Sequence, residues 1–480
     1  MAVLKRKSGV LMHVSSLPGE YSVGSFGAEA RAFVDFLADA GFSLWQVLPF
    51  CMTDEFNSPY KSLGAFSGNP FFIDLPTLYK KGLITLEELS EARQSTPYLC
   101  EFKRLREERL ELLEKAAMRI YDRSEIAECI KAIPDLRELC EFLARRDANG
   151  EKPWQEWQNE EIDPDRLFFW QFVEAEFLEQ WLLLKDYANA KGIEIIGDLP
   201  IYVAEDSADV WANKEQFLLD EKGYPTSVAG VPPDYFAKDG QLWGNPLYNW
   251  KKMKEDGYAW WRRRLGYALV LFDGVRIDHF RAFEAYWSVP KGAKTAKEGK
   301  WVKGPGRNIV DVIKKTAKDK LIIAEDLGDI TDGVRRLLDY SGFPGMRVLQ
   351  FAFLGDENTP HLPYRYPRNS VAYTGTHDNN TLLGYVWEMP EEQRKTALAY
   401  AGADGKDWNE ACKALIRTVM ESSADICILP VQDLLGYGAD TRMNTPGTSD
   451  KNWSYRITRE QLLSLSPEKF RQLNRLYGRL

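Results

Sequence analysis

Two acidic residues and an arginine in this 480-residue sequence have the types and spacing needed for nucleophilic and acid–base chemistry. Arg276 and Asp278 are two residues apart in "LFDGVRIDHFR", so on a β-strand their side chains share one face, roughly 6–7 Å apart. The cation can hold Asp278 charged, and a charged, oriented carboxylate is a nucleophile. Glu325 follows the apolar "LIIA", where partial burial would raise its pKa and keep it protonated. One charged and one protonated carboxyl about 5–5.5 Å apart is the pair that retaining glycoside hydrolysis requires.

Eight short apolar runs, two of which carry these residues, end in polar or turn residues and alternate with helix-length amphipathic segments. The runs are residues 9–19, 42–50, 193–203, 271–280, 320–328, 346–353, 370–380 and 425–436. Strands that alternate with helices predict parallel β/α winding, and eight strands close a (β/α)₈ TIM barrel. The chemistry of such a barrel lies at the carboxyl ends of its strands.

Polar residues follow five of the predicted strands at those ends. They are Asp198, Asp278, Glu325, His377 with Asp378, and Gln432 with Asp433. Any one of them could instead cap the helix that follows it. Carboxylates gathered on one rim repel one another, which folding alone would not select. Their number therefore favours a functional site at this rim.

The spacing between the runs predicts one α/β barrel domain over residues 1–480. Residues 77–190, after the second predicted strand, form a large, mainly helical insertion within it. In the segment 166–192 five apolar residues recur at helical spacing and predict a core-facing helix: Phe169, Phe172, Phe177, Trp181 and Leu184. About 45 residues follow the eighth run, too few for a C-terminal β-sandwich domain.

Composition limits the class of partner. The net charge of −9 argues against nucleic acid or an anionic membrane and favours a neutral or cationic small molecule. Six cysteines lack disulfide-motif or zinc-like spacing, which predicts free thiols in a reducing compartment. No signal peptide fits the first residues, and no segment approaches 18 unbroken apolar residues. We expect a cytoplasmic protein that needs neither a metal nor a cofactor.

Seven blocks occur in order along almost the whole chain. They are "SPYKSLGAFSGNPFFIDL" (58–75), "GDLPIYV" (197–203), "AGVPPDYFAKDGQLWGNPLY" (229–248), "VRIDHFR" (275–281), "AEDLG" (324–328), "TGTHDNNT" (374–381) and "RMNTPGT" (442–448). Together they resemble the signature blocks of the 4-α-glucanotransferase family, the amylomaltases or disproportionating enzymes of glycoside hydrolase family 77 in the α-amylase clan. One such block would be weak evidence, whereas seven in order are very specific.

The resemblance implies residue roles and a reaction. Asp278 matches the catalytic nucleophile, Glu325 the general acid/base and Asp378 a third carboxylate that stabilises the transition state. Further matches imply contact with the substrate or the reactive sugar site: Tyr60, Asp198, Gln241, Trp243, Arg276, His377 and Asn444. The implied reaction moves an α-1,4-glucan segment from a donor to the 4-hydroxyl of an acceptor glucan or glucose, through a covalent glycosyl-enzyme. Maltooligosaccharides, amylose, glycogen or starch are the implied partners.

We also predict the structure of two segments and the direction of one histidine side chain near this site. Residues 228–248 are a candidate lid that excludes water, because Gly and Pro set their turns while Tyr235, Phe236 and Trp243 offer aromatic faces. Residues 290–306 are predicted to be an exposed loop. His279 should point away from the barrel mouth if the strand continues past Asp278.

Three alternatives compete with glucan transfer. A plain α-1,4-glucan hydrolase is the nearest, although the short C-terminal tail is untypical of α-amylases. A Mg²⁺-dependent, enolase-like lyase would use Asp198, Asp278 and Glu325 as metal ligands, but Arg276 would compete with the cation. A glucan-binding protein on a degenerate barrel would have lost a carboxylate, and none is lost.

Overall fold

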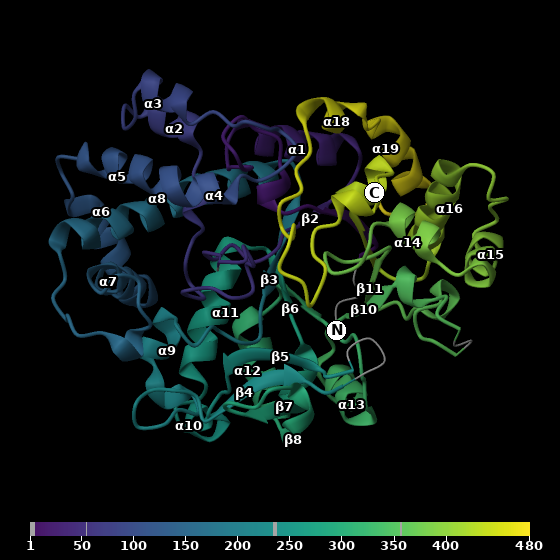
Figure 1. Ribbon diagram of the computed structural model, residues 1–480. Helices are drawn as coiled ribbons and strands as arrows, with labels where there is room; N and C mark the ends of the chain where they lie inside the picture. The colour runs from purple at the N-terminus through teal and green to yellow at the C-terminus, as the bar shows by residue number, and fades with distance from the viewer. Residues whose placement is uncertain (1–4, 54, 234–237, 356–357) are drawn as a thin grey trace.

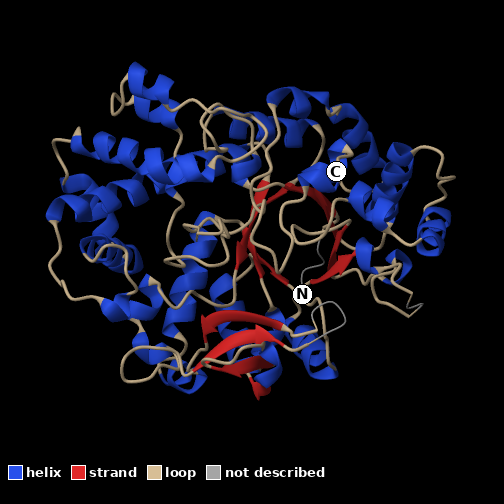
Figure 2. Ribbon diagram, viewed as in Figure 1, coloured by secondary structure: helices blue, strands red, loops and turns tan. Residues whose placement is uncertain are grey.

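A closed barrel of eight parallel strands forms the centre of the molecule, with strand order β1-β12-β11-β10-β9-β6-β3-β2 (Figures 1 and 2). The computed structural model describes residues 5–53, 55–233, 238–355 and 358–480. The barrel strands are β1 (Lys7–Leu11), β2 (Leu44–Gln46), β3 (Glu194–Leu199), β6 (Gly274–Ile277), β9 (Leu321–Ala324), β10 (Gly345–Val348), β11 (Ser370–Tyr373) and β12 (Ile426–Pro430). Each predicted run overlaps one of these strands, so the (β/α)₈ prediction is confirmed.

Helices surround the barrel and join consecutive strands (Figure 2). Around the strands lie α1 (Ala28–Asp39), α9 (Ala208–Ala212), α10 (Trp250–Glu255), α11 (Ala259–Leu271), α12 (Arg307–Ala317), α13 (Asp332–Ser341), α14 (Leu382–Glu388), α15 (Glu391–Tyr400), α16 (Trp408–Glu421), α17 (Val431–Leu435), α18 (Arg459–Ser464) and α19 (Pro467–Leu476). None of the helices in the described part of the chain is long and apolar enough to cross a lipid bilayer.

The start of β6 differs from the sequence prediction. The run was expected to be extended from residue 271, but Leu271 ends helix α11 and the strand begins at Gly274. The Leu271 carbonyl accepts a hydrogen bond from the indole N–H of Trp181 at 2.9 Å. Leu271 and Phe272 are buried beneath helices rather than in the sheet. Residues at a buried helix end and in a buried strand are both apolar, so the sequence pattern does not distinguish the two structures.

The pairing of β1 with β12 closes the barrel, and Arg479 secures this seam. The Arg479 side chain is buried and donates to the carbonyls of Lys7 (3.0 Å) and Asp425 (3.2 Å) at the starts of the two strands. It also donates to the carbonyls of Met420 and Ala424. Gly9 of β1 lies so close to β2 that a Cβ atom there would be 2.5 Å from the Cβ of Leu44.

The segment between β2 and β3 is rich in helices. It contains α2 (Leu75–Lys80), α3 (Leu86–Glu91), α4 (Phe102–Arg104), α5 (Leu110–Met118), α6 (Ser124–Lys131), α7 (Pro134–Ala148) and α8 (Pro164–Ala190). Asp163 begins α8, because its side chain accepts from the Asp165 N–H and Pro164 supplies the first helical residue. The five apolar residues predicted to face the core of this helix are all at most 2% exposed. That prediction is confirmed.

A second, antiparallel sheet lies beside the barrel in the order β5-β4-β7-β8. Its strands are β4 (Ser227–Val231), β5 (Gln241–Pro246), β7 (Ala285–Pro290) and β8 (Lys300–Lys303). The prediction that 290–306 is a loop is therefore wrong over β8, and the candidate lid 228–248 contains two strands. Tyr235 and Phe236 lie outside the described residues. The sheet as a whole was missed because its central strands, β4 and β7, pair across about 60 residues, a distance that leaves no local period, whereas its outer pairs β4–β5 and β7–β8 join strands close in the sequence.

Glu174 is a buried carboxyl on α8 with few polar neighbours. It is 0% exposed, and its two oxygens accept from the Gly68 N–H at 2.9 and 3.2 Å. Burial raises the pKa of Glu174 to about 8, although the Gly68 hydrogen bond opposes this. The folded protein therefore keeps a proton on Glu174 at neutral pH.

We expect Glu174→Gln to flatten the pH dependence of stability. Between the ordinary glutamate pKa of 4.5 and about 8, the folded state holds a proton that the unfolded state has released. Stability from this group is full below pH 4.5 and falls by up to about 1.4 kcal/mol per pH unit as pH rises toward 8. Glutamine cannot ionise, so urea unfolding at pH 5 and pH 8 should show a smaller loss in the variant. Glu179→Gln, at an exposed position of α8, should keep the wild-type slope. Equal slopes in wild type and Glu174→Gln would contradict the assignment.

Candidate functional site

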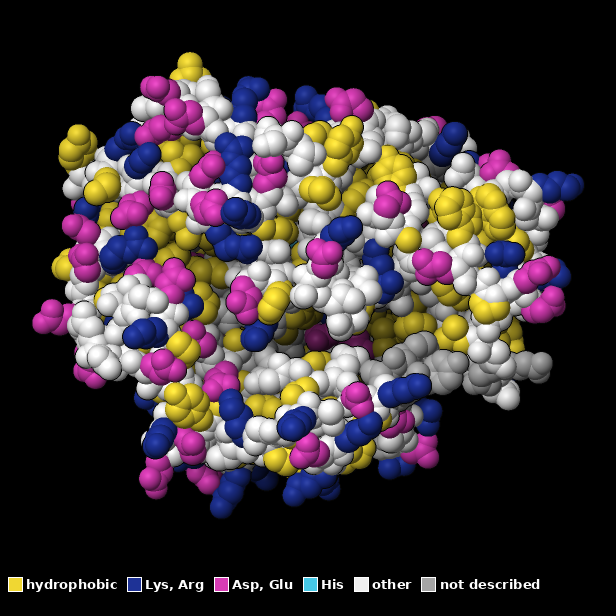
Figure 3. All heavy atoms as spheres, viewed as in Figure 1, with side chains coloured by type: hydrophobic (Ala, Val, Ile, Leu, Met, Phe, Trp, Pro, Cys, Tyr) yellow, Lys and Arg dark blue, Asp and Glu magenta, His cyan; other side chains and the backbone are white. Residues whose placement is uncertain are grey.

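The polar residues that follow the barrel strands gather on one face of the molecule. Figure 3 shows a hollow on this face with acidic side chains at its floor. The hollow lies between the barrel and the second sheet, as comparison with Figure 2 shows. This is the carboxyl end of the barrel, where the sequence predicted the site.

Arg276 lies between two carboxylates. Its Nη1 donates to both oxygens of Asp198 at 2.8 and 2.7 Å, and its Nη2 lies 2.9 Å from Asp278 Oδ1. Burial opposes the charge, but Asp198 and Asp278 raise the pKa of Arg276 well above its ordinary value. The prediction that Arg276 and Asp278 share one face is confirmed. The Asp278 side chain is 27% exposed, so it alone of the three reaches the hollow.

Glu325 directly follows β9 and is 8% exposed. Its Oε2 accepts from the His279 N–H and its Oε1 from the Leu327 N–H, each at 2.7 Å. Burial and then the charge of Asp278 raise the pKa of Glu325 to about 7, against the opposing effects of Arg276 and the two N–H donors. Because the charge of Asp278 acts on the pKa of Glu325, the two carboxyls belong to one site. A buried Glu325 with a raised pKa beside an Asp278 that is ion-paired to Arg276 is the arrangement that "LIIA" and Arg276 predicted.

His279 does not continue the strand, so the condition for its predicted direction, away from the barrel mouth, is not met. Strand β6 ends at Ile277, and His279 takes the left-handed conformation with φ of 50°. This turn directs its backbone N–H at Glu325, while its ring packs edge-on against Trp243 with centroids 4.9 Å apart. Burial lowers the pKa of His279 to about 4, so the ring is neutral. The sequence does not indicate that the backbone N–H of His279 would donate to Glu325.

Asp378, which follows β11 in the chain, is held by Asn444. Asn444 Nδ2 donates to Asp378 Oδ1 at 2.6 Å, and the Asn444 N–H donates to the His377 carbonyl at 3.1 Å. His377 Nε2 lies 3.4 Å from Asp378 Oδ2. The Asp378 side chain is 44% exposed, so its second oxygen remains accessible to a ligand.

Tyr60 connects the two groups of residues. Its hydroxyl donates to Asp198 Oδ2 at 2.8 Å, and its ring stacks on His377 with centroids 5.2 Å apart and planes 15° apart. Trp453 packs against both rings at 5.8 and 5.9 Å. This aromatic stack fixes His377 relative to Asp198.

Gln241 and Trp243 reach the site from β5 of the second sheet. Trp243 Nε1 donates to Gln241 Oε1 at 3.1 Å, and the Trp243 ring contacts His279 as described. A continuous series of contacts thus joins them to Glu325. Contacts or electrostatic effects link all ten residues that the sequence assigned to the site.

Sequence reasoning missed two residues that hold this site, Trp453 and Arg442. Arg442 Nη2 donates to the Asp378 carbonyl at 2.6 Å, and its Nε donates to the Asn444 carbonyl at 2.8 Å. Its position at the head of "RMNTPGT" was a signal that could have identified it. Trp453 lies outside the blocks, and only its contacts in the fold reveal it.

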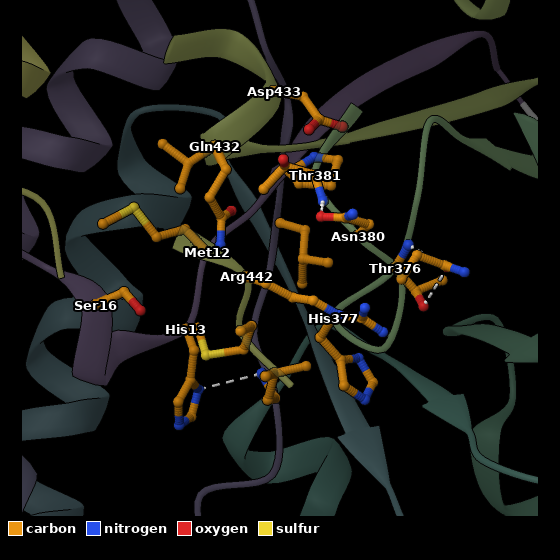
Figure 4. A pocket seen from close by; sticks show the side chains of 16 residues that line it. Met12, His13, Ser16, Thr376, His377, Asn380, Thr381, Gln432, Asp433 and Arg442 are labelled. Carbon is orange, nitrogen blue, oxygen red and sulfur yellow. Dashed lines mark hydrogen bonds between the residues drawn. The ribbon is translucent and has the colours of Figure 1, made fainter. Parts of the chain in front are cut away.

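The remaining strand-end candidates, Gln432 and Asp433, have other roles. Both line the narrow cavity of Figure 4, together with His13, His377 and Arg442. Asp433 accepts from the Thr374 hydroxyl at 2.5 Å and from the Leu382 N–H at 2.7 Å, so it anchors the start of α14. Gln432 donates to the Thr441 carbonyl at 3.2 Å. Neither residue caps the helix that follows it, because both lie within α17, so the structure gives them other contacts than the capping alternative required.

The described residues contain no group of three His, Cys, Asp or Glu side chains that could hold a metal ion. Arg276 occupies the space between Asp198 and Asp278 where the lyase alternative required a cation.

The profile of a protein family described as 4-alpha-glucanotransferase matches residues 12–462. The chain belongs to the 4-alpha-glucanotransferase family. It is therefore a glucan-transferring enzyme of the α-amylase clan, as the seven blocks predicted. The hydrolase, lyase and binding-protein alternatives are set aside.

The similarity to known proteins extends over almost the full length of both chains. The 4-alpha-glucanotransferase of Streptococcus pneumoniae is 42% identical over 496 residues, which span 99% of this chain and 98% of that protein. The 4-alpha-glucanotransferase of Thermus thermophilus is 43% identical, with 97% of each chain covered. An amylomaltase structure from Streptococcus agalactiae, in complex with acarbose, has a TM-score of 0.95 at 36% identity and covers 99% of this chain and 100% of its own.

Proposed function

We propose that the site performs transfer between α-1,4-glucans by a retaining double displacement, with Asp278 as nucleophile and Glu325 as general acid/base. The observation that carries this proposal is the pair itself: a buried carboxyl with a pKa of about 7 beside a second carboxyl ion-paired to Arg276. A carboxyl with a raised pKa and a carboxyl ion-paired to a cation suit the acid and the nucleophile that the reaction requires.

In the first step, Glu325 donates its proton to the glycosidic oxygen while Asp278 attacks the anomeric carbon. The bond to the leaving oxygen breaks, the reducing-end fragment departs with the proton, and a β-linked glycosyl-enzyme forms on Asp278. In the second step, ionised Glu325 takes the proton of an acceptor 4-hydroxyl as that oxygen attacks the same carbon. The α linkage is restored and Asp278 is released as a carboxylate.

The other site residues support these steps by positioning. Asp198 neutralises one side of Arg276, which leaves Nη2 of that guanidinium aimed at Asp278. Asp378, oriented by Asn444 and half exposed, offers Oδ2, which lies beside His377, to sugar hydroxyls and favours the positively charged transition state. Tyr60, His377, Gln241 and Trp243 form the walls against which the sugar rings would lie.

The proposed substrates are maltooligosaccharides, amylose, glycogen or starch. The Streptococcus agalactiae relative was solved with acarbose, which supports an oligosaccharide in the equivalent hollow here. All six cysteines are free thiols, which supports the cytoplasm as the location.

Incubation with maltotriose tests the function. Transfer predicts glucose together with maltopentaose and longer chains, with little gain in total reducing ends. A steady rise in reducing ends would instead show hydrolysis and would contradict the proposal. Chromatography of the products and a reducing-end assay on the same samples separate the two outcomes.

The pKa of Glu325 predicts the pH dependence of the first step. Below about pH 7 the free enzyme carries the proton that the leaving oxygen needs, and above it that proton is lost. We expect kcat/KM for maltotriose to fall by about ten-fold per pH unit on the alkaline side of pH 7. An α-maltosyl fluoride donor, whose leaving group needs no proton, should show a much weaker alkaline decline. The same decline with both donors would argue against Glu325 as the acid.

A further inference from the structure

A buried guanidinium, that of Arg281, lies beside the proposed general acid/base and has no part in the proposed double displacement. Arg281 is 5% exposed and belongs to a short 3-10 helix, η6 (Phe280–Phe283). Its Nη1 donates to the Asp329 carbonyl at 2.5 Å and lies 3.5 Å from Asp329 Oδ2. Burial lowers the pKa of Arg281, while nearby carboxylates, Glu325 among them, oppose that effect. Arg281 and Glu325 are therefore close enough to interact electrostatically.

The hydrogen bond from Arg281 to Asp329 joins the two segments that hold the Glu325 carboxyl. That carboxyl accepts from two backbone donors, the N–H groups of His279 and Leu327, each at 2.7 Å. His279 is two residues before Arg281, and Leu327 is two residues before Asp329. One side-chain contact thus fixes the spacing between the two donors.

This contact matters because residues 325–331 form neither a helix nor a strand. They connect the end of β9 to the start of α13. A connecting segment of this kind has no ladder of backbone hydrogen bonds to keep it in place. A hydrogen bond from a charged donor is roughly twice as strong as one between neutral groups. The Arg281 guanidinium is therefore an anchor in the middle of the segment that begins with Glu325.

The second sheet also contacts this guanidinium. Trp301, on the edge strand β8, has its ring centroid 3.8 Å from Arg281 Cζ, which is a favourable cation–π pair. Trp301 is in register with Trp287 of β7, and the two rings pack edge to face with centroids 5.1 Å apart. The Gly304 N–H donates to the Glu284 carbonyl at 2.7 Å, which ties the chain after β8 to the chain after η6. The position of Trp301 over Arg281 is thus set by the sheet.

We propose that Arg281 is a positioning residue for Glu325 and that Trp301 keeps Arg281 in place, an inference that rests on the proposed function. The second sheet then serves the site twice, because β5 brings Gln241 and Trp243 to the hollow while β8 supports the segment that carries the acid. Without the Arg281 contact, that segment shifts and the carboxyl spends less time where it can protonate a glycosidic oxygen.

A comparison of two donors tests this role. Arg281→Met removes the charged donor and keeps an apolar side chain. We expect kcat/KM for maltotriose to fall roughly ten-fold, because the acid is displaced. For α-maltosyl fluoride, kcat/KM reports formation of the glycosyl-enzyme without proton donation, and it should fall less than about three-fold. Arg335→Met, at an exposed position of α13, should match wild type with both donors. Equal losses with both donors, or no loss with either, would overturn the proposal.

The pH profile is a readout that a general loss of stability would not move. The Arg281 cation and the two N–H donors favour the ionised form of Glu325, so losing them raises its pKa. The alkaline limb of kcat/KM for maltotriose should therefore move to higher pH by at least about 0.5 unit in Arg281→Met. Arg281→Lys keeps the cation, and its limb should stay near that of wild type. An unmoved limb in Arg281→Met would refute the assignment.

Both variants retain the other charged and titratable groups around this pair, so these do not account for a shift. The groups are Asp278, Arg276 and His279 at the end of β6, Asp326 next to Glu325, and Asp329 and Glu284 near Arg281.

Trp301→Leu tests the support from the sheet, and it remains informative if Arg281→Met does not fold. We expect kcat/KM for maltotriose to fall roughly three-fold, with a smaller effect on the fluoride. Adding Trp301→Leu to Arg281→Met should cause no further loss, because Trp301 acts through that residue. Trp387→Leu, which changes an exposed tryptophan of α14, should behave as wild type. Wild-type kinetics in Trp301→Leu, or losses that multiply in the double variant, would overturn the role of Trp301.

Failure of the proposed function has a different signature. If Glu325 were not the acid, Glu325→Gln would lose activity equally with maltotriose and the fluoride. If Glu325→Gln separates the two donors and Arg281→Met does not, only the positioning role of Arg281 is overturned.

Discussion

Asp278→Ala is expected to lower kcat for maltotriose disproportionation by at least about 10⁴-fold. The variant keeps Arg276, Asp198 and Glu325, so protonation and binding remain, but no atom is left to form the glycosyl-enzyme. KM should change much less than kcat, because the side chain contributes mainly to the transition state. Chromatography of fluorescently labelled maltooligosaccharides over long incubations measures the residual rate.

Two controls make this result specific. Asp332→Ala, at an exposed position in the first turn of α13, should retain wild-type kcat. Added azide should restore turnover of α-glucosyl fluoride by Asp278→Ala and give β-glucosyl azide, because the small anion enters the vacated space and attacks from the same face. A kcat within ten-fold of wild type would remove Asp278 from the role of nucleophile.

Glu325→Gln should lower kcat for glucan donors by about 10³-fold, in line with the loss of a general acid and base. The two half-reactions respond differently to the donor. With α-maltosyl fluoride the first step needs no proton, whereas the second step still needs a base for the acceptor. The covalent glycosyl-enzyme should therefore accumulate, and mass spectrometry of the intact protein should show one added maltosyl group.

The same measurement separates the two carboxyls. Asp278→Ala should show no added mass, because it has no nucleophile. Glu468→Gln, at an exposed position of α19, should behave as wild type with both donors. If Glu325→Gln lost activity equally with maltotriose and the fluoride, and accumulated no adduct, its carboxyl would have a structural role instead.

The barrel was predictable because buried parallel strands appear as short, continuous apolar runs. The pair proposed as catalytic could be singled out for a related reason, since Asp278 and Glu325 follow such runs directly. The second sheet was not, because β4 and β7 pair across a separation that leaves no local pattern. The start of β6 was misplaced because Leu271 and Phe272 are apolar in either conformation.

Other features of the site depend on contacts that exist only after folding. The left-handed turn at His279 gives Glu325 a backbone donor, yet positive φ is uncommon even for histidine, which is enriched there, so the residue type alone does not predict that turn. Trp453 acts through two rings, Tyr60 and His377, that are remote from it in the sequence. Residue type and spacing pointed to the proposed reacting groups and to some of the residues that orient them, such as Arg276 and Asn444, whereas Trp453 and the backbone of His279 required coordinates.

The seam between β1 and β12 has a consequence for biosynthesis. The barrel cannot close until β12 has left the exit tunnel of the ribosome, and Arg479, which joins the starts of both strands, can stabilise the seam only after that. During translation the nascent chain exposes an unpaired β1 edge, available to a chaperone or to a wrong neighbour. Catalytic competence therefore arises only at a late stage of synthesis.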